Sequence, residues 1–135
     1  MHLNDLKLYD MHMHTHFSGD SEASPFAIAQ KACDLGLAGI CFTDHLNIDY
    51  QRTPGLFDLD IPAYKKEIAL VKDEFEGKLD IRWGIELGLQ PYLATTNQAV
   101  IEAYHFDFVI GSTHELHQQD IYFPEFYEGR NEDDC

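Results

Sequence analysis

Histidine and carboxylate side chains recur where the apolar segments of this chain end. The segment Asp10-Met-His12-Met-His14 places two imidazoles two residues apart. In an extended strand, residues i and i+2 point to the same side, so both rings can reach one cation. Taken alone, an exposed pair of histidines on an edge strand explains this spacing equally well. The pair therefore has to be interpreted together with the residues that end the other segments.

Three further apolar segments end in the same kinds of residue. His45 ends Thr43-Asp44-His45, Glu86 ends Gly84-Ile85-Glu86, and His114 ends Gly111-Ser112-Thr113-His114. One polar residue at a strand end is common, but four consecutive segments that all end in His or Glu are not expected by accident. A glutamate can bridge two ions through its two oxygens, as in many multi-metal sites. We therefore predict a cluster of divalent metal ions.

Several neighbouring residues have less certain roles. Asp20 can reach back to the same site, or can simply be a turn residue beside a glycine. Asp10 and Asp44 flank the predicted ligands and either orient them or have a capping role. His16 is expected near the site without an assigned function. Arg52 is expected to be solvated rather than to contact a phosphate.

The order of the segments predicts how these residues are positioned. Strand-like and helix-like segments alternate, which indicates a parallel sheet covered by helices. Each of the first three strands has one bulky apolar face and one small or polar face that ends in a predicted ligand, as in a barrel whose chemistry lies at the C-terminal ends of its strands. The fourth strand fits less well, because Phe108 and Ile110 share the parity of His114. Strands are predicted at residues 6–13, 38–43, 79–85 and 107–111, and helices from Ser24 to Gly36, from Asp60 to Gly77 and from Thr95 or Thr96 to about Tyr104.

Composition restricts the partners. The chain has 135 residues, a length that suits one domain, and a formal net charge of -15. That charge disfavours nucleic acid, whose phosphates are held mainly by Lys and Arg, but it allows a phosphorylated small molecule where bound cations neutralise the site. We expect no membrane span, because no apolar run approaches the required length. Three cysteines, an odd number without a C-x-x-C pair, favour a reducing, cytoplasmic location.

Together these segments resemble the PHP superfamily (polymerase and histidinol phosphatase), and most closely its histidinol-phosphatase branch. The resemblance implies an α/β fold, the N-terminal half of a distorted (β/α)7 TIM-like barrel, with up to three zinc, manganese or iron ions. The segments that carry it are 10–18, 42–45, 83–86, 107–114 and 126–130. The ligand sets that it implies are His12, His14 and Glu86 for one ion, Glu86 and His114 for a second, and Asp20 and His45 for a third.

The resemblance also implies an activity, the hydrolysis of a phosphomonoester, most closely L-histidinol phosphate in histidine biosynthesis. The ions would lower the pKa of a bound water and neutralise the phosphoryl oxygens. The family pattern continues with later ligands that residues 1–135 do not contain. We therefore expect the N-terminal part of a single PHP domain, completed by its second half or by an oligomeric partner. The alternatives are a PHP-type nuclease or phosphoesterase on other phosphoesters, an inactive metal-binding fragment, and a different amidohydrolase-like barrel.

Overall fold

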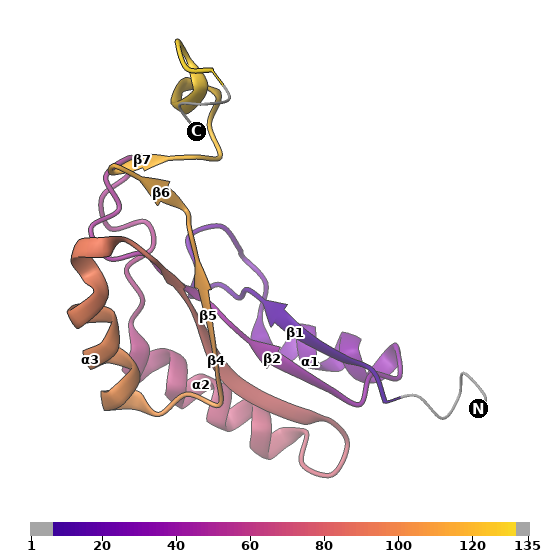
Figure 1. Ribbon diagram of the computed structural model, residues 1–135. Helices are drawn as coiled ribbons and strands as arrows, with labels where there is room; N and C mark the ends of the chain where they lie inside the picture. Colours follow the sequence, from indigo (N-terminus) through magenta and orange to yellow (C-terminus); the bar gives the residue numbers. More distant parts are fainter. Residues whose placement is uncertain (1–6, 132–135) are drawn as a thin grey trace.

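The computed structural model describes residues 7–131, in which one curved sheet carries three helices. The main strands are parallel: β1 pairs with β2, β2 with β4, and β4 with β5. Figure 1 shows the helices along one side of this sheet and the C-terminal segment projecting beyond it. The predicted α/β half-barrel with a parallel sheet is confirmed. The elements are β1 (Tyr9–Met13), α1 (Pro25–Asp34), β2 (Gly39–Phe42), β3 (His45–Leu46), α2 (Ile61–Glu74), β4 (Asp80–Gly88), η2 (Pro91–Leu93), α3 (Ala94–Tyr104), β5 (Phe108–Ser112), β6 (Glu115–Leu116), β7 (Gln119–Asp120) and η3 (Pro124–Tyr127).

The strand that carries His45 is interrupted and resumes. β2 ends at Phe42, and the two-residue strand β3 begins at His45 on the same edge of β4. The register is unchanged across the interruption, because Phe42 pairs with Trp83 and His45 pairs with Glu86. The carbonyl oxygen of Asp44 still accepts a hydrogen bond from the amide N–H of Glu86. His45 therefore keeps the predicted face. The strand predicted at 38–43 corresponds to β2, and His45 lies beyond it in the separate short strand β3.

The helix boundaries follow local chemistry. Asp60 caps α2, because its carboxylate accepts a hydrogen bond from the amide N–H of Ala63 at 3.0 Å. Ser24 occupies the N-cap position of α1, but its side chain makes no capping hydrogen bond, so this helix start depends on the proline that follows it. Gly36 and Gly77 follow α1 and α2 with φ of 73°, a left-handed conformation that glycine adopts without strain.

The core lies between the sheet and the helices. Ile40, Phe42 and Ile85 from the outward faces of the strands are fully buried against Tyr64 and Ile68 of α2. These are the apolar faces that strand parity predicts to meet the helices. The opposite face of the sheet carries small and polar side chains, and it leads to the predicted ligands.

The fourth strand departs from this pattern, as its parity indicates. Phe108 pairs with Gly84 and Ile110 pairs with Glu86, so both bulky side chains lie on the ligand face of the sheet. Phe108 is 38% exposed, whereas Val109 packs toward the core. The ligand face of β5 is therefore apolar and partly open to solvent.

The predicted strand boundaries are shifted in two places. β4 extends to Gly88, so Glu86 lies inside the strand and not at its end, because β5 continues to pair with it as far as Ser112. β1 begins at Tyr9; the predicted start at Leu6 lies outside the described residues. Within residues 7–131, no helix is both long and apolar enough to cross a membrane.

Candidate metal centre

Glu86 of β4 lies at the middle of a group of histidines that come from β1, from β3 and from the end of β5. Its side chain is buried in the sheet, and each carboxylate oxygen faces different imidazoles. The Oε2 atom lies 2.8 Å from Nε2 of His12 and 2.9 Å from Nε2 of His14. The Oε1 atom lies 3.0 Å from Nε2 of His114. One carboxylate thus contacts histidines that are 28 and 72 or more residues away along the chain.

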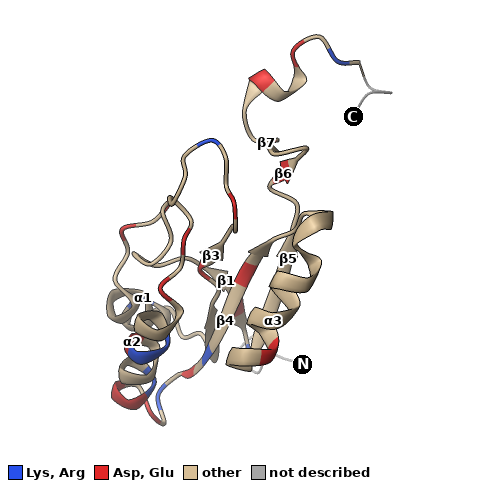
Figure 2. Cartoon of the chain, turned by 90° about the vertical axis from the view of Figure 1, so that its left-hand side faces the viewer, with Lys and Arg blue, Asp and Glu red and all other residues tan. Residues whose placement is uncertain are grey.

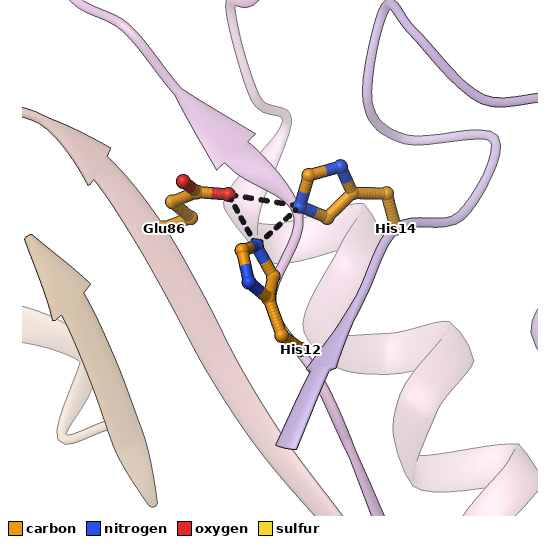
Figure 3. A group of neighbouring side chains, drawn as sticks. All are labelled: His12, His14 and Glu86. Atoms are coloured by element: carbon orange, nitrogen blue, oxygen red, sulfur yellow. Dashed lines mark hydrogen bonds and ion pairs between the residues drawn. The ribbon is translucent and has the colours of Figure 1, made fainter. Parts of the chain in front are cut away.

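The predicted histidine pair converges on this carboxylate. Figure 3 shows the rings of His12 and His14 leaving β1 and its continuation toward Glu86. Their Nε2 atoms lie 3.1 Å apart, and each is within 3 Å of the same oxygen. Two imidazole nitrogens and a carboxylate oxygen therefore surround one small volume, and this side-by-side placement follows from the i, i+2 spacing on an extended segment.

His45 and Asp20 extend the cluster to a second group. The Oδ2 atom of Asp20 lies 3.1 Å from Nδ1 of His14 and 3.4 Å from Nε2 of His45. Asp20 comes from the loop after β1, so it does reach back toward the strand ends rather than only serving as a turn residue. The ligand atoms form three groups whose members all lie within 4.8 Å of one another: His12, His14 and Glu86; His14, Asp20 and His45; and His45, Glu86 and His114.

The charge states of these groups depend on one another. Burial alone would raise the pKa of Glu86, but hydrogen bonds from His114, His14 and His12 hold it well below its usual range. The hydrogen bond to Glu86 also raises the pKa of His14 to about 9, against the opposing effect of burial. Burial lowers the pKa of His45 to about 4, so its ring is neutral at physiological pH. The cluster therefore combines a carboxylate, a cationic ring and a neutral ring within a few ångströms.

The donor set fits a divalent ion. His45 Nδ1 is buried, lies 3.5 Å from Glu86 Oε2, and has no hydrogen-bond partner among the described residues. A buried imidazole nitrogen without a partner is costly, and a neutral imidazole with a free lone pair is the form that binds metal. Imidazole and carboxylate donors in this combination suit zinc, manganese and iron.

A buried loop network holds these ligands in place. The carboxylate of Asp44 accepts hydrogen bonds from the amide N–H of Thr15 at 2.6 Å and from its hydroxyl at 3.0 Å. The amide N–H of His45 donates to the hydroxyl of Ser18 at 2.8 Å. All of these side chains are buried. Asp44 thus fixes the backbone at Thr15, next to His14. Among the described residues, its carboxylate makes no hydrogen bond to the ring of a candidate ligand, so the structure does not show Asp44 orienting such a ring.

Other polar residues near the cluster have structural roles. Asp10 accepts a hydrogen bond from the amide N–H of His12, not from its ring. His16 faces Glu67 of α2 at 3.4 Å and lies against Phe17, away from the three groups. Arg52 stacks on Phe123, with its guanidinium carbon 3.3 Å from the ring centroid, so it is neither simply solvated nor placed among the ligands.

Sequence reasoning missed the residues that surround the cluster. Asn47 follows β3, and its Oδ1 lies 3.1 Å from Nδ1 of His114, which orients that ring. The Tyr50 hydroxyl donates to the Asp120 carboxylate at 2.5 Å and so ties the loop after β3 to β7. Both contacts join residues about 70 positions apart. In the sequence, the only sign of these contacts is that the segments that carry the residues are polar.

A pocket opens beside the cluster. Its volume is about 630 Å³, and its walls come from the loop after β3 and from the segment around β7. Asp20, His45 and His114 form the side that faces the cluster. The remaining wall includes four aromatic residues, and we therefore call this space the aromatic pocket; these residues are Tyr50, Phe57, Tyr122 and Phe123.

Comparison with known proteins identifies the family. Residues 10–134 match the model of the PHP domain. The chain belongs to the PHP domain family. This confirms the resemblance drawn from the motif segments, and the match begins at Asp10, at the start of the histidine motif.

Histidinol phosphatases are among the known proteins similar to this chain. The histidinol-phosphatase of Lactococcus lactis subsp. lactis is 38% identical over 124 residues, which cover 90% of this chain and 45% of that protein. The probable histidinol-phosphatase of Deinococcus radiodurans is 38% identical over 129 residues, covering 92% of this chain and 50% of that protein. This PHP chain therefore spans about half the length of the curated relatives it matches.

Solved structures agree with this family assignment. The crystal structure of the Lactococcus lactis histidinol phosphate phosphatase, complexed with zinc, L-histidinol and phosphate, superposes with a TM-score of 0.86 at 36% identity. It is matched over 95% of this chain and 48% of its own length. A structure from Listeria monocytogenes superposes with a TM-score of 0.76 at 19% identity, which supports the fold alone.

Proposed function

We propose that residues 1–135 form the N-terminal part of a single PHP domain, and that this domain hydrolyses L-histidinol phosphate to L-histidinol and phosphate in the histidine biosynthesis of the cytoplasm. The observation that carries the proposal is the convergence of imidazoles from β1, β3 and the end of β5 on Glu86. The solved relative that contains zinc, L-histidinol and phosphate supports it.

The proposed ligands divide into three groups. His12, His14 and Glu86 would hold one ion, Glu86 and His114 a second with His45 beside them, and His14, Asp20 and His45 a third. Zinc is the first candidate, with manganese and iron as alternatives. When bound, such ions supply an activated water and neutralise charge on phosphoryl oxygens.

The chain's own residues prepare this site in three ways. Glu86 remains ionised at neutral pH, because the surrounding histidines stabilise its carboxylate more than burial destabilises it. His45 remains neutral because it is buried, so its lone pairs stay available. The network from Asp44 to Thr15 holds both strand ends in position before any ligand arrives.

The aromatic pocket suits the organic part of the substrate. It adjoins the cluster through His45 and His114, so a phosphate at the cluster would direct its ester group into the pocket. Aromatic side chains favour a flat heterocycle, and the acidic groups nearby favour a cationic amine. An imidazole with an amino group meets both conditions, whereas a nucleic acid backbone is disfavoured by the net charge of -15.

The test measures phosphate release from L-histidinol phosphate by the purified chain with zinc or manganese. A parallel sample contains the separately produced part of the Lactococcus lactis enzyme that this chain does not match. The proposal predicts release that depends on the metal in at least the second sample, and loss of release in the Glu86→Gln variant. Zinc-loaded samples that release no phosphate from this substrate in either arrangement would contradict it.

A further inference from the structure

The side chains of Asn47 and His114 meet over β4, although they follow two different strands. Figure 2 shows β3 and β5 on either side of β4, and both strands pair with it. Asn47 directly follows β3, and His114 follows the last residue of β5, Ser112, by two positions. The Oδ1 atom of Asn47 lies 3.1 Å from Nδ1 of His114. The amide therefore connects the ends of two strands that carry candidate metal ligands.

Gly88 leaves the space in which the Asn47 side chain lies. A Cβ atom at residue 88 would lie 2.6 Å from Oδ1 and 2.9 Å from Cγ of Asn47, closer than side-chain atoms approach one another. Gly88 has the same parity as Glu86 on β4, so this space opens on the ligand face of the sheet. The missing side chain at one strand position thus allows the amide to reach His114, as expected where another chain segment approaches a strand closely.

Burial and a backbone hydrogen bond fix the position of Asn47. The residue is 3% exposed, and its backbone N–H donates to the carbonyl oxygen of Phe57 at 3.2 Å. A supporting side chain whose own conformation is restricted by packing can hold a metal ligand in one geometry, whereas a mobile surface side chain cannot. Asn47 is therefore suited to orient the His114 ring before an ion binds.

The contact also determines which nitrogen of His114 is available to an ion. A neutral imidazole carries its proton on one ring nitrogen, and the other nitrogen offers a lone pair. The carbonyl oxygen of Asn47 can only accept a hydrogen bond, so it favours the proton on Nδ1. The Nε2 atom, which lies 3.0 Å from Oε1 of Glu86, can then exchange a proton for an ion while the bond at Nδ1 is kept. An amide NH₂ group facing Nδ1 would instead favour the proton on Nε2, where it would exclude the ion.

We propose that Asn47 is a positioning residue of the metal centre, which holds His114 with its proton on Nδ1 so that Nε2 binds an ion together with Glu86. Gly88 makes this contact possible. The inference rests on the proposed metal centre, and it assigns a task there to two residues that bind no ion themselves. Hydrogen-bond partners of metal-binding histidines account for about 10- to 100-fold in metal affinity, so the effect is large enough to measure.

The first measurement is zinc affinity, by competition titration with a chelator. Asn47→Leu keeps the approximate volume of the side chain but removes the acceptor, so zinc affinity at the group of His45, Glu86 and His114 should fall at least about tenfold. Asn47→Asp keeps an acceptor oxygen in the same place and should bind zinc at least as tightly as the parent chain. A residue that only filled the space over Gly88 would give the opposite order, because leucine fills that space without adding a charge.

The second measurement is a nitrogen–proton correlation spectrum of the zinc-loaded chain, which shows the ring nitrogen of His114 that carries the proton. The His114→Gln variant identifies these signals by their absence. In the parent chain and in Asn47→Asp, we expect zinc on Nε2 and a proton on Nδ1 that exchanges slowly with solvent. In Asn47→Leu this proton should exchange faster, because it has lost its acceptor. Gly88→Ala changes no polar group but should have the same effect, because its Cβ displaces the amide.

Asn97→Leu is the matched control. Asn97 is also a buried asparagine beside Gly88, with its Nδ2 atom 3.3 Å from the carbonyl oxygen of that glycine, but within residues 7–131 it belongs to none of the ion groups. This variant should bind zinc like the parent chain, and thermal melts confirm that each variant folds. Equal zinc affinity in the parent chain and in Asn47→Leu, or a proton on Nε2 of His114 in the zinc-loaded parent chain, would overturn the proposal. A parent chain that binds no zinc would overturn the metal centre along with it.

Discussion

The Nε2 atom of His114 lies 3.0 Å from the Oε1 atom of Glu86, on a different oxygen from the one that faces His12 and His14. The two oxygens of one buried carboxylate thus serve two separate groups of imidazoles. This arrangement makes Glu86 the shared member of two of the three candidate ion groups.

The first prediction concerns this shared carboxylate. Glu86→Gln keeps the shape of the side chain but removes its charge and one acceptor, so both groups that contain it lose a ligand. We expect zinc affinity at these two groups to fall by more than about 100-fold, since even residues that only support a metal ligand account for about 10- to 100-fold. Zinc content per chain, measured by atomic emission after dialysis, checks this.

Glu115→Gln is the matched control for that measurement. Glu115 is also a buried glutamate, but it accepts hydrogen bonds from Gln51 and Gln90 and belongs to none of the ion groups. The zinc content of the Glu115→Gln variant should equal that of the parent chain. Equal zinc content in the parent chain, Glu86→Gln and Glu115→Gln would show that Glu86 does not bind zinc.

Local periodicity was sufficient to predict which histidines come together in the candidate ion groups. The spacing of His12 and His14 determines that both rings leave one side of an extended segment, whatever the rest of the chain does. Glu86 and His114 could be added because parallel strands end at a common edge. Asp20 remained ambiguous in the sequence, because its approach to His14 depends on the path of a loop.

The missed features depend on contacts between distant segments. The interruption at Asp44 arises because its carboxylate binds the backbone of Thr15, which lies 29 residues earlier. The bond from Tyr50 to Asp120 spans 70 residues. Neither partner carries a local pattern that identifies the other, so such pairs become visible only when the fold brings the segments together.

The second prediction concerns Asp20. Among the described residues, the group of His14, Asp20 and His45 is the only ion group that contains Asp20, so Asp20→Asn should weaken zinc binding at that group alone, by about tenfold or more. Competition titration with a zinc chelator resolves the weakest site from the others. Asp10→Asn is the comparison, because Asp10 is exposed and, among the described residues, its carboxylate accepts a hydrogen bond only from the backbone of His12. If Asp20→Asn and Asp10→Asn both bind zinc at each site as tightly as the parent chain, Asp20 is not a zinc ligand.

The third prediction follows from the raised pKa of His14. Its pKa of about 9 in the ion-free chain means that the ring is protonated at neutral pH, and the stabilising contact with Glu86 is lost as pH rises through about 9. Zinc requires the neutral ring, so binding must release this proton. We expect zinc affinity to increase from about pH 7 to about pH 9, with roughly one proton released from His14 near pH 7. Calorimetry in two buffers of different ionisation enthalpy measures the release, and a pH-independent affinity would contradict the prediction.

The fourth prediction concerns the buried loop network. Asp44→Ala leaves the amide and hydroxyl of Thr15 without their acceptor in a buried position. The free energy of unfolding should fall by about 2–4 kcal/mol. Urea unfolding measures the loss. Asp10→Ala, an exposed site, should change it by about 0.5 kcal/mol or less. Equal stability of the two variants would show that Asp44 does not hold the loop.

The most direct test of the central claim is a crystal structure of the chain with zinc, with ions located by anomalous scattering at the zinc edge. The account predicts peaks at about 2.0–2.2 Å from nitrogen and oxygen atoms of His12, His14, Glu86 and His114. Zinc bound only elsewhere on the surface, with these four side chains free of it, would contradict the account.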